Sequence, residues 1–182
     1  MPPVTKIWLF TLLPGNTASD PTFTELWNDI FELVNSYTQN KPSAKCKEQH
    51  VLLQDENNPT QLALITGYPS LEISLEADRV YAEKFLKTMF ELVKHDRLLM
   101  IEEDIDRLPL HNGRVVLSLL TEEPISEQMV TVQGGWDVWQ PPGAQGAPSK
   151  TTYIGISPQR GVEEYFPFKD GAQADHGKIE TA

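Results

Sequence analysis

The first 110 residues alternate between two patterns of apolar positions. Segments with apolar residues at successive or alternate positions are typical of strands, and segments with apolar residues three or four positions apart are typical of amphipathic helices. Read in order, the segments predict strand, helix, strand, strand, helix, strand. This is the order of a ferredoxin-like βαββαβ core. We therefore predict an α+β fold.

The first strand is expected over residues 7–13, where both parities are apolar, so both faces of the sheet are expected to be covered. A helix follows to about Thr38. It begins at Thr22, which forms a capping-box signature with Glu25. Its apolar stripe consists of Phe23, Leu26, Trp27, Ile30, Phe31, Val34 and Tyr37.

Residues 45–54 and 61–68 predict two strands joined by a turn at 55–59. A second helix is expected to be capped by Ser74 and to run to about Lys94, and the fourth strand is expected over residues 97–105. The stripe of this helix consists of Ala77, Tyr81, Phe85, Thr88, Met89 and Leu92.

The pattern changes beyond Leu108. Residues 114–120, 130–139 and 151–156 predict strands, with no amphipathic helix among them, and the residues from Lys169 are polar. We therefore divide the chain into a ferredoxin-like domain (1–110), a β-rich extension (111–168) and a polar tail (169–182). The extension fits either a degenerate second lobe of the same kind or an arm that embraces a partner subunit.

Two short sequences support a resemblance for residues 4–110: Leu13-Pro14-Gly15 after the first strand, and Gly67-Tyr68-Pro69-Ser70 before the second helix. This part of the chain resembles the dimeric α/β-barrel superfamily, and within it the antibiotic-biosynthesis-monooxygenase-like proteins. The resemblance implies a homodimer whose two sheets form a barrel, with a pocket between the sheet and the helices of each subunit. Members include cofactor-independent monooxygenases of aromatic polyketides, haem-degrading enzymes, and cyclases or decarboxylases.

The net charge limits the classes of partner, and the cysteine count limits the disulfides and the compartment. A net charge of -11 disfavours nucleic acid and anionic membranes, and no apolar run approaches the ~20 residues of a membrane span. Cys46 is the single cysteine, which excludes an intrachain disulfide and makes the cytoplasm the simplest compartment. Neither nucleotide-binding glycine motifs nor metal-ligand spacings occur in the sequence, so we expect no cofactor and no metal.

The candidate catalytic residues are His50, Tyr68 and Tyr81. His50 shares a strand face with Glu48, so it is a candidate general base that Glu48 orients, although a half-exposed histidine is the plainer interpretation. The two tyrosines are placed to hydrogen-bond a phenol or an enolate, but buried tyrosines usually serve packing alone. Candidate substrate-binding aromatic residues are Trp8, Trp27, Phe31, Trp136 and Trp139, with core packing or an interface as the alternative.

Other residues are weaker candidates. His95 is expected at the end of the second helix, where the helix dipole explains it. His111 lies in a turn, His176 in the tail, and Cys46 has no supporting motif. The acidic residues Glu102, Glu103, Asp104 and Asp106 are expected to form a solvated edge.

The leading hypothesis is a cofactor-independent enzyme of natural-product (secondary) metabolism. It would act on an aromatic or polycyclic, polyketide- or terpenoid-like apolar substrate through an enolate or phenolate. Monooxygenation, decarboxylation, cyclisation and isomerisation all begin from such an anion. The alternatives are a non-catalytic dimeric small-molecule-binding protein and a structural dimerisation module.

Overall fold

The computed structural model describes residues 2–38, 50–110, 114–120, 130–133, 136–137, 153–158, 166–172, 174–175 and 178–179. Its first part contains β1 (Val4–Leu12), α1 (Pro21–Thr38), β2 (His50–Asp55), β3 (Gln61–Tyr68), α2 (Leu71–Lys84), α3 (Leu86–Leu92), β4 (Val93–Ile101) and the 3-10 turn η1 (Ile105–Arg107). The remaining strands are β5 (Arg114–Leu120), β6 (Val130–Gln133), β7 (Trp136–Asp137), β8 (Tyr153–Pro158), β9 (Phe166–Ala172), β10 (Ala174–Asp175) and β11 (Lys178–Ile179).

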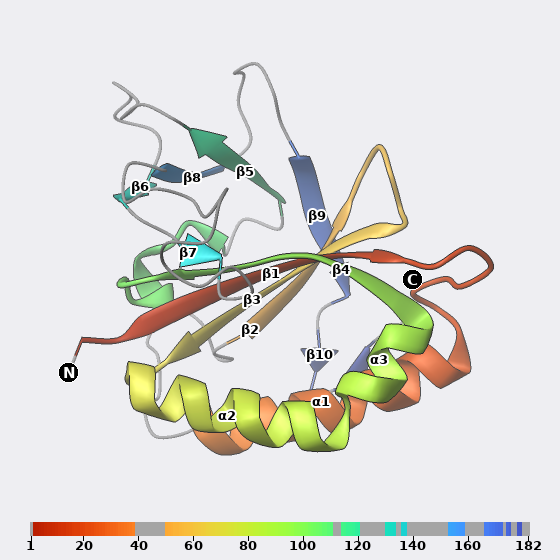
Figure 1. The fold of residues 1–182 in the computed structure, drawn as a ribbon. Helices are drawn as coiled ribbons and strands as arrows, with labels where there is room; N and C mark the ends of the chain where they lie inside the picture. The colour runs from red at the N-terminus through yellow and green to blue at the C-terminus, as the bar shows by residue number, and fades with distance from the viewer. Residues whose placement is uncertain are drawn as a thin grey trace.

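The central strands are ordered β2-β3-β1-β4, with β1 antiparallel to both β3 and β4. This is the strand order of a ferredoxin-like βαββαβ fold, and the three helices pack on one face of the sheet (Figure 1). The α+β prediction is confirmed. The third strand and the turn before it are as expected. Strand β3 occupies residues 61–68, and the Asp55 carboxylate accepts hydrogen bonds from the amides of Asn57 and Asn58 in the β2–β3 turn.

The second helix differs from its prediction at both ends. Ser70, not Ser74, is the N-cap, and its hydroxyl accepts a hydrogen bond from the Ile73 amide at 3.4 Å. Ser74 lies buried in the first turn. The helix breaks at Phe85, and β4 begins at Val93, four residues before the expected strand. Because Val93 is β-branched and buried, packing on the sheet outweighs the helical spacing there.

The first helix begins at Pro21, so Thr22 lies inside the helix and is not the predicted N-cap. The Asp20 carbonyl accepts the hydrogen bond of the Thr24 amide at 2.9 Å, which makes Asp20 the residue before the helix. Proline is favoured at the first helical position because its missing N–H has no partner to lose there. This local preference displaces the helix start from Thr22 to Pro21.

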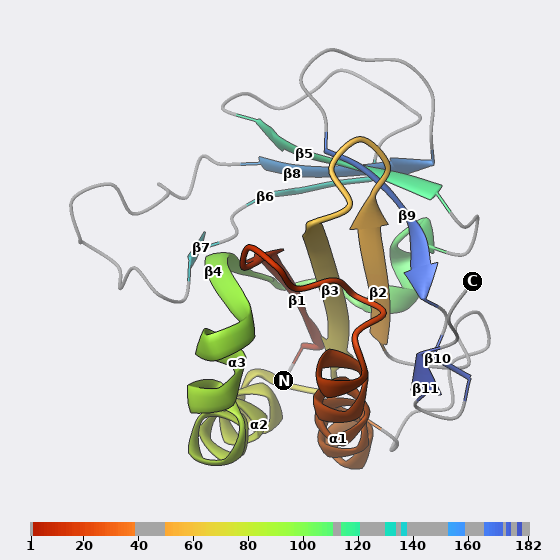
Figure 2. The same ribbon diagram turned by 90° about the vertical axis from the view of Figure 1, so that its right-hand side faces the viewer.

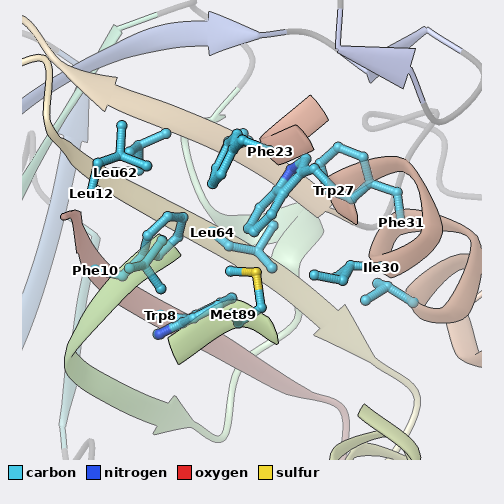
Figure 3. Packing of buried hydrophobic residues seen from close by; sticks show 13 residues of the cluster. Trp8, Phe10, Leu12, Phe23, Trp27, Ile30, Phe31, Leu62, Leu64 and Met89 are labelled. Atoms are coloured by element: carbon cyan, nitrogen blue, oxygen red, sulfur yellow. The ribbon is translucent and has the colours of Figure 1, made fainter. Parts of the chain in front are cut away.

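Alternate residues of β1 face the two sides of the sheet. Trp8 and Phe10 face the helices and join the aromatic cluster of Trp27 and Phe31 on α1 (Figure 3). Ile7 belongs to a separate cluster on the opposite side. The expectation that both faces of the first strand are covered is confirmed.

The face opposite the helices is covered by the chain's own C-terminal strands. Val115 and Leu117 on β5 and Ile156 on β8 pack in one cluster with Ile7, Leu53, Ala63, Ile65, Leu99 and Ile101. Figure 2 shows β5, β6 and β8 on the side away from α1 and α2. Strand β9 pairs with both β2 and β5 and so joins these strands to the central sheet. Lys169, the first residue of the predicted polar tail, lies inside this strand.

Replacing Ile156 by Val tests whether the extension and the first 110 residues share one core. Ile156 is fully buried in the cluster that both parts build. Removal of one methylene is expected to lower the free energy of unfolding by about 0.5–1.5 kcal/mol. Urea unfolding followed by tryptophan fluorescence measures the change. An unchanged transition would show that the extension contributes nothing to the stability of the core.

Candidate functional site

A cavity of about 280 Å³ lies between the sheet and the helices. This volume is close to the lower end of the range of small-molecule sites, roughly 300–1,000 Å³. Four groups of residues line it: Lys6 and Trp8 on β1, Leu64, Thr66 and Tyr68 on β3, His95 and Leu98 on β4, and residues of the three helices. The helix residues are Ile30, Leu33, Val34, Ala77, Asp78, Tyr81, Ala82 and Leu86.

A buried ion pair forms part of the wall. The Lys6 ammonium pairs with the Asp78 carboxylate and donates a hydrogen bond to the Ser74 carbonyl oxygen at 3.3 Å. Burial lowers the pKa of Lys6, and the carboxylate of Asp78 opposes this effect. The Lys6 side chain is 5% exposed and that of Asp78 35%. The Asp78 carboxylate is therefore partly solvated, whereas the Lys6 ammonium is stabilised almost entirely by protein groups.

Asp78→Asn is expected to destabilise the protein by about 1–3 kcal/mol at neutral pH, because it leaves a buried ammonium without its counter-ion. The substitution also lowers the pKa of Lys6 further below the ordinary value of 10.5. As the pH rises through this lowered pKa, the folded state releases the proton while the unfolded chain still binds it, so stability returns. Urea unfolding at pH 7 and pH 10 checks this. A difference from wild type that does not shrink at pH 10 would contradict the argument.

A bulge in β4 brings His95 into the cavity. The register passes from the pair Leu9–Arg97 to the pair Phe10–His95, so Asp96 is the extra residue. Without the bulge, His95 and Leu98, three positions apart, would lie on opposite faces of the strand. The imidazole stacks on Trp8 with the ring centres 4.8 Å apart. His95 therefore lies in β4 and not at the end of the second helix, where it was predicted.

Several buried polar atoms of the cavity wall have no hydrogen-bond partner among the described residues. They are Trp8 Nε1, Thr66 Oγ1 and the Tyr81 hydroxyl. Trp8 is 7% exposed and Thr66 2% exposed. Buried polar groups normally find a partner, and a bound molecule is one way to supply it. The cavity therefore has largely apolar walls, within which a few polar atoms lie buried without a partner among the described residues.

Burial sets the proton-transfer properties of the cavity. It lowers the pKa of His95, although the nearby Asp96 carboxylate raises it, so the imidazole is neutral at physiological pH and able to accept a proton. Burial, with a smaller contribution from the Asp78 charge, raises the pKa of Tyr68 and that of Tyr81. Both tyrosines therefore keep their protons and can act as hydrogen-bond donors.

His50, the predicted base, is not among the residues that line this cavity. It is 3% exposed and stacks on Phe31, with the ring centres 4.5 Å apart. Burial lowers its pKa to about 4. His50 pairs with Thr66 across the sheet, so it lies one strand away from the cavity wall. Glu48 lies outside the described residues.

The other predicted site residues divide into two groups. Tyr68, Tyr81 and Trp8 line the cavity, as a substrate site would require. Trp27 and Phe31 are 0% exposed and belong to the aromatic core instead. The remaining candidates Trp139, His111, Cys46 and His176 lie outside the described residues, as does the side chain of Trp136.

The acidic residues after β4 build a turn. Asp104 caps η1 through the Asp106 amide, and Arg107 pairs with Glu103. In the part of the chain that the structure describes, no group of three His, Cys, Asp or Glu side chains is placed to hold a metal ion. Within the same residues, every helix is too short or too polar to cross a membrane.

Sequence reasoning missed Lys6, Thr66 and Asp78 as cavity residues. A signal for Lys6 was present, because it is the one charged residue in a strand that is otherwise apolar or threonine. Asp78 lies three positions before Tyr81, so the two side chains share a helix face. Thr66 gives no signal in the sequence, because its position in the wall depends on the sheet register.

Comparison with known proteins finds distant structural similarity alone. No family model matches the chain, and no curated protein matches its sequence. One similar solved structure is described as "Putative Chlorite dismutase"; it has 9% identity and a TM-score of 0.47, over 86% of this chain and 79% of that one. Another is described as "Putative monooxygenase" from Fusobacterium nucleatum subsp. nucleatum; it has 10% identity and a TM-score of 0.45, over 86% of this chain and 75% of that one. Such distant similarity carries no argument about chemistry.

Proposed function

We propose that this chain is a cofactor-independent enzyme that binds a small planar apolar molecule in the cavity and removes a proton from it. The observation that carries the proposal is an apolar cavity of about 280 Å³ whose wall holds unpartnered polar atoms of Trp8, Thr66 and Tyr81. Apolar walls with a few convergent polar groups are typical of small-molecule sites.

The base in this proposal is His95 and not His50, because His95 lines the cavity. The imidazole nitrogen takes a proton from a carbon next to a ketone, or from a phenol. When the C–H bond breaks, its electron pair moves toward the ketone oxygen and gives an enolate. The protonated Tyr81 hydroxyl donates a hydrogen bond to that oxygen, which stabilises the charge as it forms.

The expected natural-product substrate belongs to the same proposal. The cavity volume favours a molecule of one or two rings over a larger polycyclic compound. Monooxygenation, decarboxylation, cyclisation and isomerisation remain open, because each begins from the same anion. The homodimer also stays a prediction. The sheet face where two such subunits would meet is covered here by the chain's own β5 and β8.

Exchange of the acidic protons of 2-tetralone, a bicyclic aromatic ketone, measures enolate formation without a second substrate. The protein in D₂O is expected to accelerate this exchange, followed by proton NMR. His95→Gln is expected to slow the catalysed exchange about 100-fold, the lower limit for loss of a general base. His50→Gln is the matched control and is expected to retain most of the rate.

The outcomes separate the hypotheses. Loss of exchange in His50→Gln but not in His95→Gln would return the base assignment to His50. Saturable binding of the ketone, measured by tryptophan fluorescence, without faster proton exchange would favour the hypothesis of a non-catalytic binding protein. Absence of binding would leave a structural module.

A further inference from the structure

We propose that Lys6 is a further catalytic residue, which holds the ligand oxygen on which negative charge develops, and that Asp78 is its positioning residue. This inference rests on the proposed function and names the substrate class of the same site. The substrate is a molecule that enters neutral, carries a ketone or phenol oxygen, and becomes an oxyanion when its proton is removed.

The geometry at Lys6 leaves one donor available. An ammonium group has three N–H donors. The Asp78 carboxylate and the Ser74 carbonyl oxygen accept two of them, and no further acceptor is present among the described residues. The Tyr68 ring centre lies 5.3 Å from the ammonium nitrogen, which is within the range of a cation–π contact and confines the group on one side.

Among the described residues that line the cavity, Lys6 is also the single cation. Trp8, Thr66 and Tyr81 offer neutral groups, and the lowered pKa of His95 leaves it neutral. A full charge in a water-poor site interacts more strongly with an oxyanion than with a neutral ketone oxygen. The interaction therefore grows as the proton leaves, which is the requirement for stabilising a transition state.

The Lys6–Asp78 pair is neutral as a whole, and this sets the charge of the ligand that enters. A carboxylate or phosphate would meet the Asp78 charge beside the Lys6 ammonium. A ketone or phenol meets no such repulsion. Asp78 also opposes the loss of the Lys6 proton that burial favours. It keeps the donor charged while the ligand changes from neutral to anionic.

4-Nitrophenol reports this charge preference directly, because its phenol and phenolate forms absorb at different wavelengths. Bound to the wild-type protein, it is expected to ionise at a pH at least one unit below its pKa in water, which means at least tenfold tighter binding of the phenolate. Lys6→Met is expected to abolish this preference and to retain binding of the neutral form. A merely structural lysine would not change the ionisation of a bound ligand.

The matched control is Lys84→Met, which removes an exposed lysine in the last turn of α2 that does not line the cavity. It is expected to leave the ionisation of bound 4-nitrophenol unchanged. Lys6→Arg keeps the charge and is expected to retain part of the preference. Circular dichroism establishes that each variant is folded.

The wild-type protein alone keeps the inference testable if Lys6→Met does not fold. Wild-type binding of neutral 4-nitrophenol as tight as that of its phenolate would overturn the role of Lys6 and leave the proposed function standing. An unchanged preference in folded Lys6→Met would do the same. Failure of both 4-nitrophenol and 2-tetralone to bind the wild-type protein would overturn the proposed function itself.

Discussion

Trp27→Ala is expected to lower the free energy of unfolding by about 3–5 kcal/mol, the usual cost of deleting a large buried aromatic side chain. Trp27 is 0% exposed and joins the aromatic residues of α1 to those of β1. Its ring stacks on Phe23 at 5.4 Å, approaches Trp8 at 5.9 Å and Phe10 at 5.4 Å, and meets Phe31 edge-on at 5.4 Å. The deletion leaves a void that four rings border, and packed rings relax only partly.

Urea unfolding followed by far-UV circular dichroism measures this loss, with two variants for comparison. Trp27→Phe retains a ring and removes an indole N–H that has no partner among the described residues, so it should cost much less than Trp27→Ala. Leu75→Ala removes a side chain that is 50% exposed and should change stability by less than about 0.5 kcal/mol. A loss below about 1 kcal/mol in Trp27→Ala would show that this cluster is not the main core.

Acidification is expected to destabilise the folded protein through His50, by roughly 3 kcal/mol between pH 6.5 and about 4. Burial lowers the pKa of this histidine from 6.5 to about 4. Within that window the unfolded chain binds a proton that the folded state does not, so stability falls as the pH falls. Below about pH 4 both states are protonated and this contribution changes no further.

His50→Gln removes the titrating group and isolates its contribution. Wild type and variant are compared by urea unfolding at pH 7 and pH 4.5. Carboxylates contribute to the acid sensitivity of both proteins, so the informative quantity is the difference between the two slopes. Equal losses of stability in wild type and variant would show that His50 is not the buried neutral group described here.

The strand order and the two-sided burial of the sheet could be predicted because they depend on local patterns. The apolar run of β1 requires cover on both faces, and the structure provides the helices on one face and β5 and β8 on the other. Of the predicted site residues, Tyr68, Tyr81 and Trp8 lie in the wall of a cavity between sheet and helices, and their roles stay a prediction. Helical spacing put Tyr81 on the inner stripe of its helix, and Tyr68 and Trp8 were candidates as aromatic residues of predicted strands.

Other parts of the site could not be predicted, because they depend on contacts between distant segments. His95 faces the cavity only because β4 bulges at Asp96, whose carboxylate accepts a hydrogen bond from Thr11 on β1 and pairs with Lys94. Helical periodicity through Leu92 extended the helix past the real start of the strand. His50 stands on the helix-facing side as expected of a site residue, but Phe31 covers it.

The resemblance to dimeric barrels also raised a question that residue patterns left open. An apolar sheet face can be covered by a second subunit or by the same chain. Strand β9 pairs with both β2 and β5, so the same chain covers this sheet face. Neither pairing leaves a local signal, because the partners lie more than 40 positions apart in the sequence.

The cover on the second sheet face has a consequence during synthesis. Strand β9 begins at Phe166, so 56 residues must be added after Leu110 before β9 can begin to pair with the edge of β2. At about 5–20 residues per second, the apolar face of Ile7, Ile65 and Leu99 waits roughly 3–11 s on the ribosome. During that interval each nascent chain presents an uncovered sheet to its neighbours. Slower translation beyond residue 110 should therefore raise the demand for chaperones. It should not affect the protein once it has folded.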